Sequence, residues 1–250
     1  MNLEMLISKF LQNLSYAFVF FVSLIQVPFV YCEVCRFDST VINESNYNFL
    51  AKDKTCLRVK SIQLDETRLR QIDFPFIEKV KESIVISGAY CADKLDLIKA
   101  DKLEFVGRKI EIVYNDLVSK ISFPNLKTAQ ELTIYSNDLV SNIYLPSLSS
   151  ANIIRISWNN SLQKLSIPSL QNTELLQIQN NNMLRRIYLD KIHLKSSFNP
   201  VYFILLNNRI NLDVCMHKEK INETELIFLG IDSMKNVKKC LIDHKEKYHF

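Results

Sequence analysis

The chain has 250 residues, a formal net charge of +4 at pH 7 and a hydrophobic content of 48%, which is enough for one domain with a sizeable core. Only three glycines are present. This scarcity excludes the glycine-rich phosphate loops of kinases, P-loop proteins and dinucleotide-binding folds. Because the lysines and arginines are scattered and not clustered, the composition also argues against a nucleic-acid partner.

Residues 1–32 have the features of a secretory signal peptide. A single lysine, Lys9, precedes an apolar run, and Val30 and Cys32 suit the small-residue positions before a cleavage point. We therefore expect a secreted, extracellular protein whose mature chain begins near Glu33. The alternative is an uncleaved membrane anchor, since the apolar run is close to the length that spans a bilayer.

The centre of the chain repeats itself. From Ile110 to Ile192 one pattern recurs every 22 residues without insertion or deletion. Each copy opens with an I-x-I pattern, passes through an asparagine, and ends in a second apolar-x-apolar pattern. Alternation with period 2 indicates strands, and no copy has helical spacing. Such self-similarity is the signature of a solenoid, and we predict an all-β, right-handed parallel β-helix with coils of about 22 residues.

Looser copies extend the pattern on both sides. Leu57 and Val59 are expected to open an earlier coil, Leu95 and Leu97 to serve as the second strand of the next, and Phe203 to restart the pattern. This gives about seven strands per sheet.

One column of the repeat is polar and consists of asparagines that follow the first strand. A buried asparagine stacked on its copy in the next coil can bond corner backbone groups that no strand ladder reaches, so we expect a structural role. The column comprises Asn115, Asn137, Asn159 and Asn181.

The cysteines suggest how the open ends of the solenoid are covered. We expect an N-terminal cap at 33–56, the β-helix at 57–214, and a C-terminal cap with a polar tail at 215–250. In a secreted protein, disulfide-closed caps are a sensible solution, although connectivity cannot be proved from sequence. The disulfide candidates are Cys35, Cys56, Cys215 and Cys240, while Cys91 is left over, as a buried thiol or as the cysteine of an intermolecular bond. Neither pair has zinc-site spacing, and no metal or cofactor is expected.

Three N-x-S/T sequons follow the signal segment. Asn159 belongs to the inward asparagine column, so Asn43 and Asn222 are the plausible glycan sites. The segment from Asn222 to Ile231 also has the pattern of a short capped helix over the last coil.

The cysteine-flanked start, the N-x-x-L-x-x-I-x-F-P-x-L coils and the ending LLNNRINLDVC resemble the receptor L-domain. This is the leucine-rich-repeat-like module of insulin and EGF receptor ectodomains, and the likeness is strongest to stand-alone nematode versions. It covers about residues 35–240. The resemblance implies a right-handed β-helix with disulfide caps and, as in the receptors, peptide-hormone binding on one sheet face. This chain differs from the receptors in showing one such domain, without a furin-like region or a kinase.

The outward columns of the first sheet carry residue types that dominate binding interfaces. We therefore expect a non-catalytic module that holds an extracellular peptide or protein ligand, insulin-like or EGF-like by resemblance, or a receptor ectodomain. The alternative is a structural or adhesive matrix protein, or an ordinary solvated sheet. If the first sheet does not hold the ligand, the second face is the next candidate, with Lys120, Asn142, Lys164 and Arg186 beside Tyr144 and Tyr188. The expected ligand-binding residues are Tyr114, Thr133, Tyr135, Arg155, Trp158 and Gln177.

An enzyme is the third class considered. A β-helix that cleaves polysaccharide needs convergent carboxylates on one face, with or without a metal. The outward columns are mostly neutral, and Asp116 and Asp138 stand at a corner where turn formation explains them. We expect no catalytic site.

Overall fold

The computed structural model describes residues 38–88, 95–192, 202–206, 208, 212–216, 227–229 and 238–240. All described residues belong to the second of two units of the chain, Cys35–Phe250. The expected signal segment, Cys91 and Asn222 lie outside the described residues. Among the residues that are described, no helix is long and apolar enough to cross a membrane.

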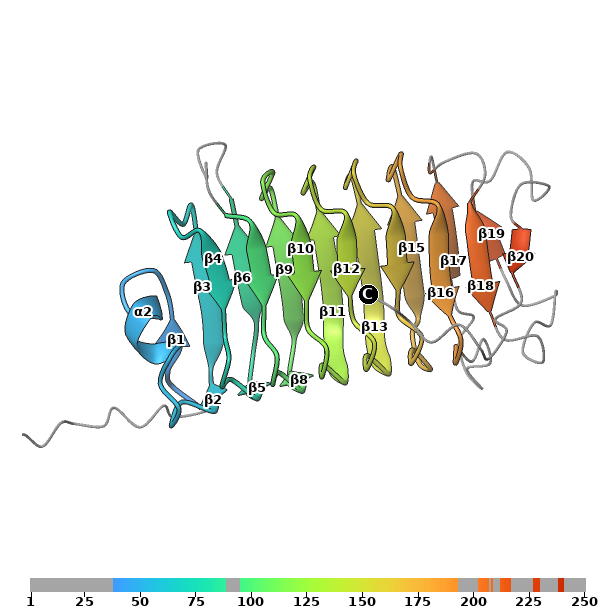
Figure 1. The fold of residues 1–250 in the computed structure, drawn as a ribbon. Coiled ribbons are helices and arrows are strands. Elements are labelled where there is room, and N and C mark those ends of the chain that lie inside the picture. The colour runs from blue at the N-terminus through green and yellow to red at the C-terminus, as the bar shows by residue number, and fades with distance from the viewer. Residues whose placement is uncertain are drawn as a thin grey trace, which may run out of the picture. The chain divides into compact units, whose positions relative to one another are not determined.

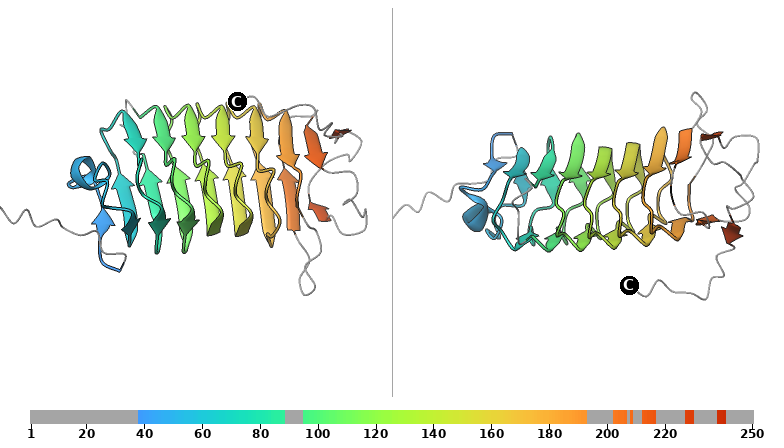
Figure 2. Two further views of the ribbon diagram at one scale, coloured as in Figure 1. Left: turned by 60° about the horizontal axis from the view of Figure 1, so that its bottom comes forward. Right: turned by 90° about the horizontal axis from the view of Figure 1, so that it is seen from above.

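The second unit is a parallel β-solenoid, which confirms the prediction from the 22-residue period (Figures 1 and 2). Its larger sheet, sheet A, is built from successive coils that all pair in parallel. Its strands, in order, are β1 (Val41–Ile42), β3 (Ser61–Asp65), β6 (Ile84–Ser87), β9 (Lys109–Val113), β11 (Thr128–Tyr135), β13 (Ser150–Ser157), β15 (Leu175–Gln179), β17 (Tyr202–Leu206) and β19 (Ile227–Leu229).

Sheet B forms the opposite wall, and a short third side joins sheet A. In sheet order, the strands of sheet B are β4 (Gln71–Asp73), β7 (Leu97–Lys99), β10 (Lys120–Ser122), β12 (Asn142–Tyr144), β14 (Lys164–Ser166), β16 (Arg186–Leu189), β18 (Asp213–Met216) and β20 (Lys238–Cys240). The third side consists of β2 (Arg58–Val59), β5 (Lys79–Val80) and β8 (Phe105–Val106), and β8 pairs with the start of β11.

The core is a set of columns that run from coil to coil. In sheet A, Leu132 lies in register between Ile110 and Ile154, and all three side chains are fully buried. Ile143 of sheet B is equally buried between its neighbours on β10 and β14. Each fully buried side chain of this size stabilises the fold by about 1.5–3 kcal/mol. The I-x-I alternation therefore sets both the strand direction and the inward face.

The sequence pattern misplaced the start of the first full coil. Ile62, not Leu57, pairs with Ile84 in sheet A, and Val59 belongs to the side strand β2. Both stretches alternate apolar and polar residues, so spacing alone does not say which one enters the main sheet.

The second loose coil and the last strands also differ from the predictions. Ile98, not Leu95, pairs with Ile121, so that Leu97 lies in the outward column of Lys120. The helix expected from Asn222 to Ile231 is wrong at its centre, because Ile227–Leu229 is strand β19 and pairs with β17. Parallel pairing outweighs the local capping pattern there.

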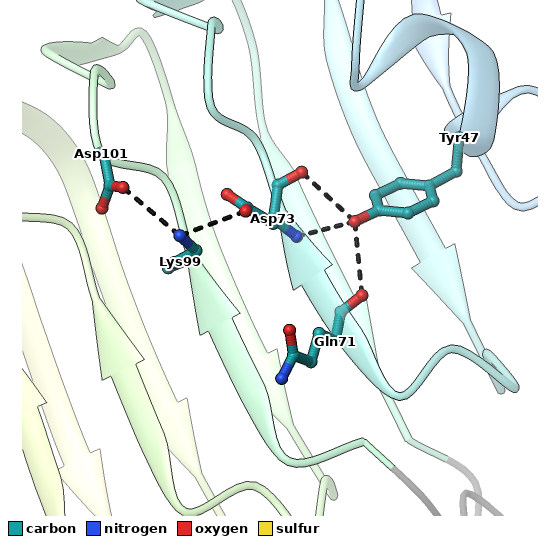
Figure 3. A network of polar contacts seen from close by, with 5 residues as sticks. All are labelled: Tyr47, Gln71, Asp73, Lys99 and Asp101. Carbon is teal, nitrogen blue, oxygen red and sulfur yellow. Dashed lines mark hydrogen bonds and ion pairs between the residues drawn. The ribbon is translucent and has the colours of Figure 1, made fainter.

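A short helix, α2 (Tyr47–Leu50), is fastened to sheet B by a network of polar contacts (Figure 3). The Tyr47 hydroxyl accepts a hydrogen bond from the Asp73 amide at 2.7 Å and lies 3.4 Å from the Gln71 carbonyl oxygen. Burial raises the pKa of Tyr47. Lys99 bridges Asp73 at 3.2 Å and Asp101 at 3.5 Å, and the hydrogen bond with Asp73 raises the pKa of Lys99. The first coil is thereby covered by residues far apart in sequence.

Three of the four expected disulfide cysteines lie in described segments, at Cys56, Cys215 and Cys240. Cys56 is fully buried and disulfide-bonded. Cys35 lies outside the described residues, so its pairing with Cys56 stays a prediction. The backbone register places Cys215 directly opposite Cys240 on β18 and β20. Neighbouring strands are about 4.8 Å apart, which suits the Cα spacing of a disulfide, and that pairing also stays a prediction.

Candidate binding surface

The corner that follows each of the strands β9, β11, β13 and β15 begins with a residue in the left-handed region. Tyr114, Ser136, Trp158 and Asn180 have φ values of 57°, 50°, 58° and 54°. This conformation is uncommon outside glycine and reverses the chain direction. In each coil it brings the next residue, an asparagine, inward. Uniform backbone geometry thus holds four different side chains at equivalent places.

The inward asparagines form a hydrogen-bonded ladder, as expected. The Asn137 Nδ2 group donates to the carbonyl oxygens of Ile112 and Tyr135, both at 3.0 Å, and to Asn159 Oδ1 at 3.2 Å. Asn137 Oδ1 in turn accepts from the amide and the side chain of Asn115, both at 3.1 Å. The ladder satisfies backbone groups that the strand ladder leaves open.

The described part of the ladder runs from Asn115 to Asn208. Asn208 extends it beyond Asn181, with its Oδ1 accepting from the Asn181 amide at 3.1 Å. At the other end, the buried Asn115 Oδ1 has no hydrogen-bond partner among the described residues. At the corresponding position one coil earlier, the sequence has Ala89 and no asparagine. The asparagine column is therefore structural.

The sequons differ sharply in exposure. Asn159 is 0% exposed and its side chain is fully engaged in the ladder. Asn43 is partly exposed, and its Oδ1 accepts from the amide and hydroxyl of Ser45 at 3.0 and 2.6 Å. Asn43 thus stays a candidate glycan site.

A second ladder runs along the outside of the same corner. The Asn160 Nδ2 group donates to Asp138 Oδ1 at 2.9 Å, and Asn182 donates to Asn160 Oδ1 at 3.1 Å. Asp116 continues this column. Its pKa is raised, first by partial burial and then by the charge of Asp138. The outer corner is therefore acidic at one end and neutral at the other.

Exposed apolar side chains gather at this corner. The described residues include seven exposed large hydrophobic side chains, of which only Phe49 and Phe105 lie elsewhere. The other five form what we call the corner ridge: Tyr114, Leu117, Leu139, Trp158 and Met183. Apolar side chains that gather on one exposed part of a protein can mark an interaction site.

Leu117, Leu139 and Met183 were missed in the sequence. The sequence did contain a signal, because two apolar residues are adjacent in N-D-L-V. Adjacent side chains of an extended segment point to opposite sides, so only one of the two can be buried. Val118 and Val140 take the inward positions and are fully buried, which leaves Leu117 and Leu139 outside.

The outer face of sheet A brings the other expected ligand residues close to the ridge. Tyr135 packs edge-on against Tyr114, with ring centroids 5.4 Å apart. Thr133 lies in register with Arg155, which in turn lies in register with Gln177. All six expected residues therefore lie on one continuous face with its corner.

The charges of this face are already paired. Arg155 forms an ion pair with Glu131 diagonally across β11 and β13, and Lys109 pairs with Glu111. Gln177 Nε2 donates to Gln179 Oε1 at 2.9 Å. Arg155 is therefore a weaker ligand contact than its residue type suggests, whereas Trp158, 47% exposed, and Tyr114, 45% exposed, are accessible.

Metal binding has no support in the described part of the chain, where no group of three or more His, Cys, Asp or Glu could hold an ion. No family model matches the sequence, and no match was found among curated proteins or among solved structures.

Proposed function

We propose that this chain is a secreted, non-catalytic binding module that holds an extracellular peptide or protein ligand on sheet A and the corner ridge. The observation that carries the proposal is the gathering of five of the seven exposed large hydrophobic side chains at one corner. The resemblance to receptor L-domains, which the coil motif suggests, favours an insulin-like or EGF-like ligand.

The residue types of the ridge support a protein partner. Trp and Tyr are enriched among residues whose truncation costs most in protein interfaces, and exposed Met adapts to varied surfaces. Trp158 and Tyr114 are held in a defined backbone conformation by the asparagine ladder beneath them. A partner therefore meets aromatic side chains whose backbone is already ordered, which lowers the entropic cost of binding.

The acidic end of the corner favours a partner that carries a basic group. Asp116 lies beside Leu117, and Asp138 lies beside Leu139. A ligand that inserts apolar side chains over the ridge and places a lysine or arginine near the two carboxylates relieves their mutual repulsion. Charge complementarity of this kind contributes chiefly to association rate and specificity.

The proposal is tested by screening the purified chain against a library of secreted peptides and receptor ectodomains, in parallel with a ridge variant. The variant is Tyr114→Asn with Trp158→Asn, because Asn180 already occupies this backbone conformation with φ 54°. Asparagine avoids the strain that alanine would add at positive φ.

We expect partners of the native chain to lose about 10- to 100-fold in affinity for the ridge variant, as for truncated interface anchors. The matched control replaces the two exposed aromatics outside the ridge, Phe49→Asn and Phe105→Asn, and should leave affinity unchanged. A partner that binds the ridge variant and the native chain equally well would refute the proposed site.

A further inference from the structure

The outer face of sheet B differs in charge from that of sheet A. Strands β10, β12, β14 and β16 contain the cations Lys120, Lys164 and Arg186 and not one Asp or Glu. The facing strands β9, β11, β13 and β15 carry two cations and two carboxylates, which pair with each other. Among these eight strands, the excess of positive charge therefore lies in sheet B, and the next position of its column, on β18, is Asp213.

The three cations belong to one column. Lys120, Asn142, Lys164 and Arg186 are partners in register on successive strands. With strands about 4.8 Å apart, Lys120 lies about 9.6 Å from Lys164 along the solenoid axis, and Arg186 lies about 4.8 Å further on. The solenoid backbone fixes these intervals.

A tyrosine organises part of this column. The Lys164 ammonium lies 5.1 Å and the Arg186 guanidinium carbon 5.8 Å from the centroid of the Tyr188 ring. Arg186 also donates to the Tyr188 hydroxyl at 3.0 Å, and its other terminal nitrogen lies 3.7 Å from Asp213. Two like charges are therefore held close together over one buried ring.

Polar groups without partners lie under the same face. Ser166 is 1% exposed, sits in register between Tyr144 and Tyr188, and its hydroxyl has no hydrogen-bond partner among the described residues. Asn142 Oδ1 is likewise buried without a partner within the described chain. Buried polar atoms in native proteins are usually satisfied, by water or ligand if not by protein.

We infer that this face, defined by Lys120, Asn142, Tyr144, Lys164, Arg186 and Tyr188, binds an acidic polysaccharide whose sulfate or carboxylate groups lie along the cationic column. Arginine is suited to both anions because its guanidinium matches their geometry. Hydroxyls of the sugar chain can reach the polar side chains between the cations, directly or through water.

Two other anionic polymers fit this face less well. An acidic peptide laid across it would leave its own amides unpaired, since the backbone groups of these central strands are used in the parallel ladder. Single-stranded nucleic acid gains much of its affinity from bases stacked on exposed aromatics. Tyr188 is only 9% exposed and is covered by cations.

The inference is tested with the full chain and four soluble probes: heparin, hyaluronan, neutral dextran and poly-glutamate. Calorimetry or interferometry at low and moderate salt should show binding to heparin or hyaluronan that weakens with salt, and none to dextran. Binding confined to poly-glutamate, equal binding to poly-glutamate and heparin, or no binding to either polysaccharide would overturn the inference.

Two triple variants distinguish binding by the cations of this face from an effect of the overall charge of the protein. The triple variant Lys120→Gln, Lys164→Gln, Arg186→Gln should lose about 10-fold or more in affinity for heparin at low salt. The control triple variant Lys60→Gln, Lys81→Gln, Lys127→Gln removes the same formal charge elsewhere, and its affinity should stay within about 2-fold of the native value. Equal losses in the two triple variants would contradict a defined site.

A single substitution keeps the inference testable if the triple variant does not fold. Lys120 is exposed and is not among the cations held over Tyr188. Lys120→Glu should therefore keep the native melting temperature and still weaken heparin binding several-fold. An unchanged affinity would count against the face. Partner binding at the corner ridge should be unaffected, which keeps this test independent of the proposed function.

Discussion

The inner and outer columns of one corner are adjacent in sequence and opposite in character. The inner column is asparagine in each coil of the exact repeat, buried and bonded to backbone from two coils. The outer column changes from Asp116 and Asp138 to Asn160 and Asn182, and its bonds are solvent-exposed. The flanking ridge positions vary further, from Tyr114 to Ser136 to Trp158.

This difference separates what the fold needs from what it permits. An inward side chain must fill a space of fixed size and form hydrogen bonds with the backbone groups of the corner. The same residue type therefore recurs in each coil of the exact repeat. An outward side chain meets water, so variation costs little there and leaves room for recognition. The predictions below test that separation, beginning with the largest effect.

The largest effect is expected from a charge placed inside the wall. Ile134 is fully buried, and Ile134→Asp puts an unpaired carboxylate between two coils, which should destabilise the fold by several kcal/mol. Thr133→Asp, one residue away on the outward side, should be tolerated. Chemical unfolding and secretion yield are the measurements, and equal damage from the two substitutions would disprove the inward and outward assignment.

The second test compares the two ladders. Asn137→Ala leaves buried donors and acceptors in two coils without partners, at about 1–3 kcal/mol each, so the total loss should exceed about 3 kcal/mol. Asn160→Ala removes two exposed bonds, one to Asp138 and one from Asn182, and should cost about 0.5 kcal/mol or less. Similar midpoints in urea for the two variants would show that the inner ladder is not structural.

The third test concerns the ridge itself. Tyr114→Asn with Trp158→Asn alters exposed side chains while keeping residues that tolerate positive φ. The melting temperature should stay within about 2 °C of the native value, as for surface substitutions in a domain of this size. A larger fall would mean that the aromatics hold the corner together.

The smallest effect is electrostatic. The pKa of Asp116 is raised in the folded protein by burial and by Asp138. The folded state thus binds this proton more readily than the unfolded state, and stability increases as the pH falls from neutral through the folded pKa. At pH 7 the charged pair costs stability, so Asp116→Asn should stabilise the protein by about 0.5 kcal/mol or less, because water screens exposed groups.

The pH profile supplies the control for that substitution. Below the pKa that Asp116 has in the unfolded chain, its carboxyl is neutral in the folded and the unfolded state. The difference in the free energy of unfolding between the native protein and Asp116→Asn should therefore shrink as the pH falls from 7 towards acid. A stabilisation that is independent of pH would assign the effect to packing instead of charge.

The sequence revealed the interior better than the exterior. The columns of Ile134, Ile143 and Asn137 were predictable because each coil repeats the same burial constraint. The position of the first coil was not predictable from the sequence, because two neighbouring stretches alternate apolar and polar residues in the same way. The register in the structure shows that Ile62 pairs with Ile84 in sheet A.

The candidate site was predicted only in part, because its residues lie on the exterior, where the repeat imposes no common constraint. Tyr114 and Trp158 were recognised by residue type, and the structure exposes both at one corner. The pairing of Arg155 with Glu131 runs diagonally between strands and depends on side-chain conformations that a repeat does not constrain. The contribution of Leu139 to the ridge depends on which of two neighbouring apolar residues turns inward.

The central claim is that the corner ridge, and not another part of the solenoid, meets the partner. Hydroxyl-radical footprinting with mass spectrometry tests it directly, because the ridge contains the readily oxidised side chains Trp158, Tyr114 and Met183. On addition of a captured partner, oxidation of these three should fall, while that of Phe49 and Phe105 stays constant. Unchanged oxidation at the ridge together with protection of Tyr144 or Phe49 would contradict the account.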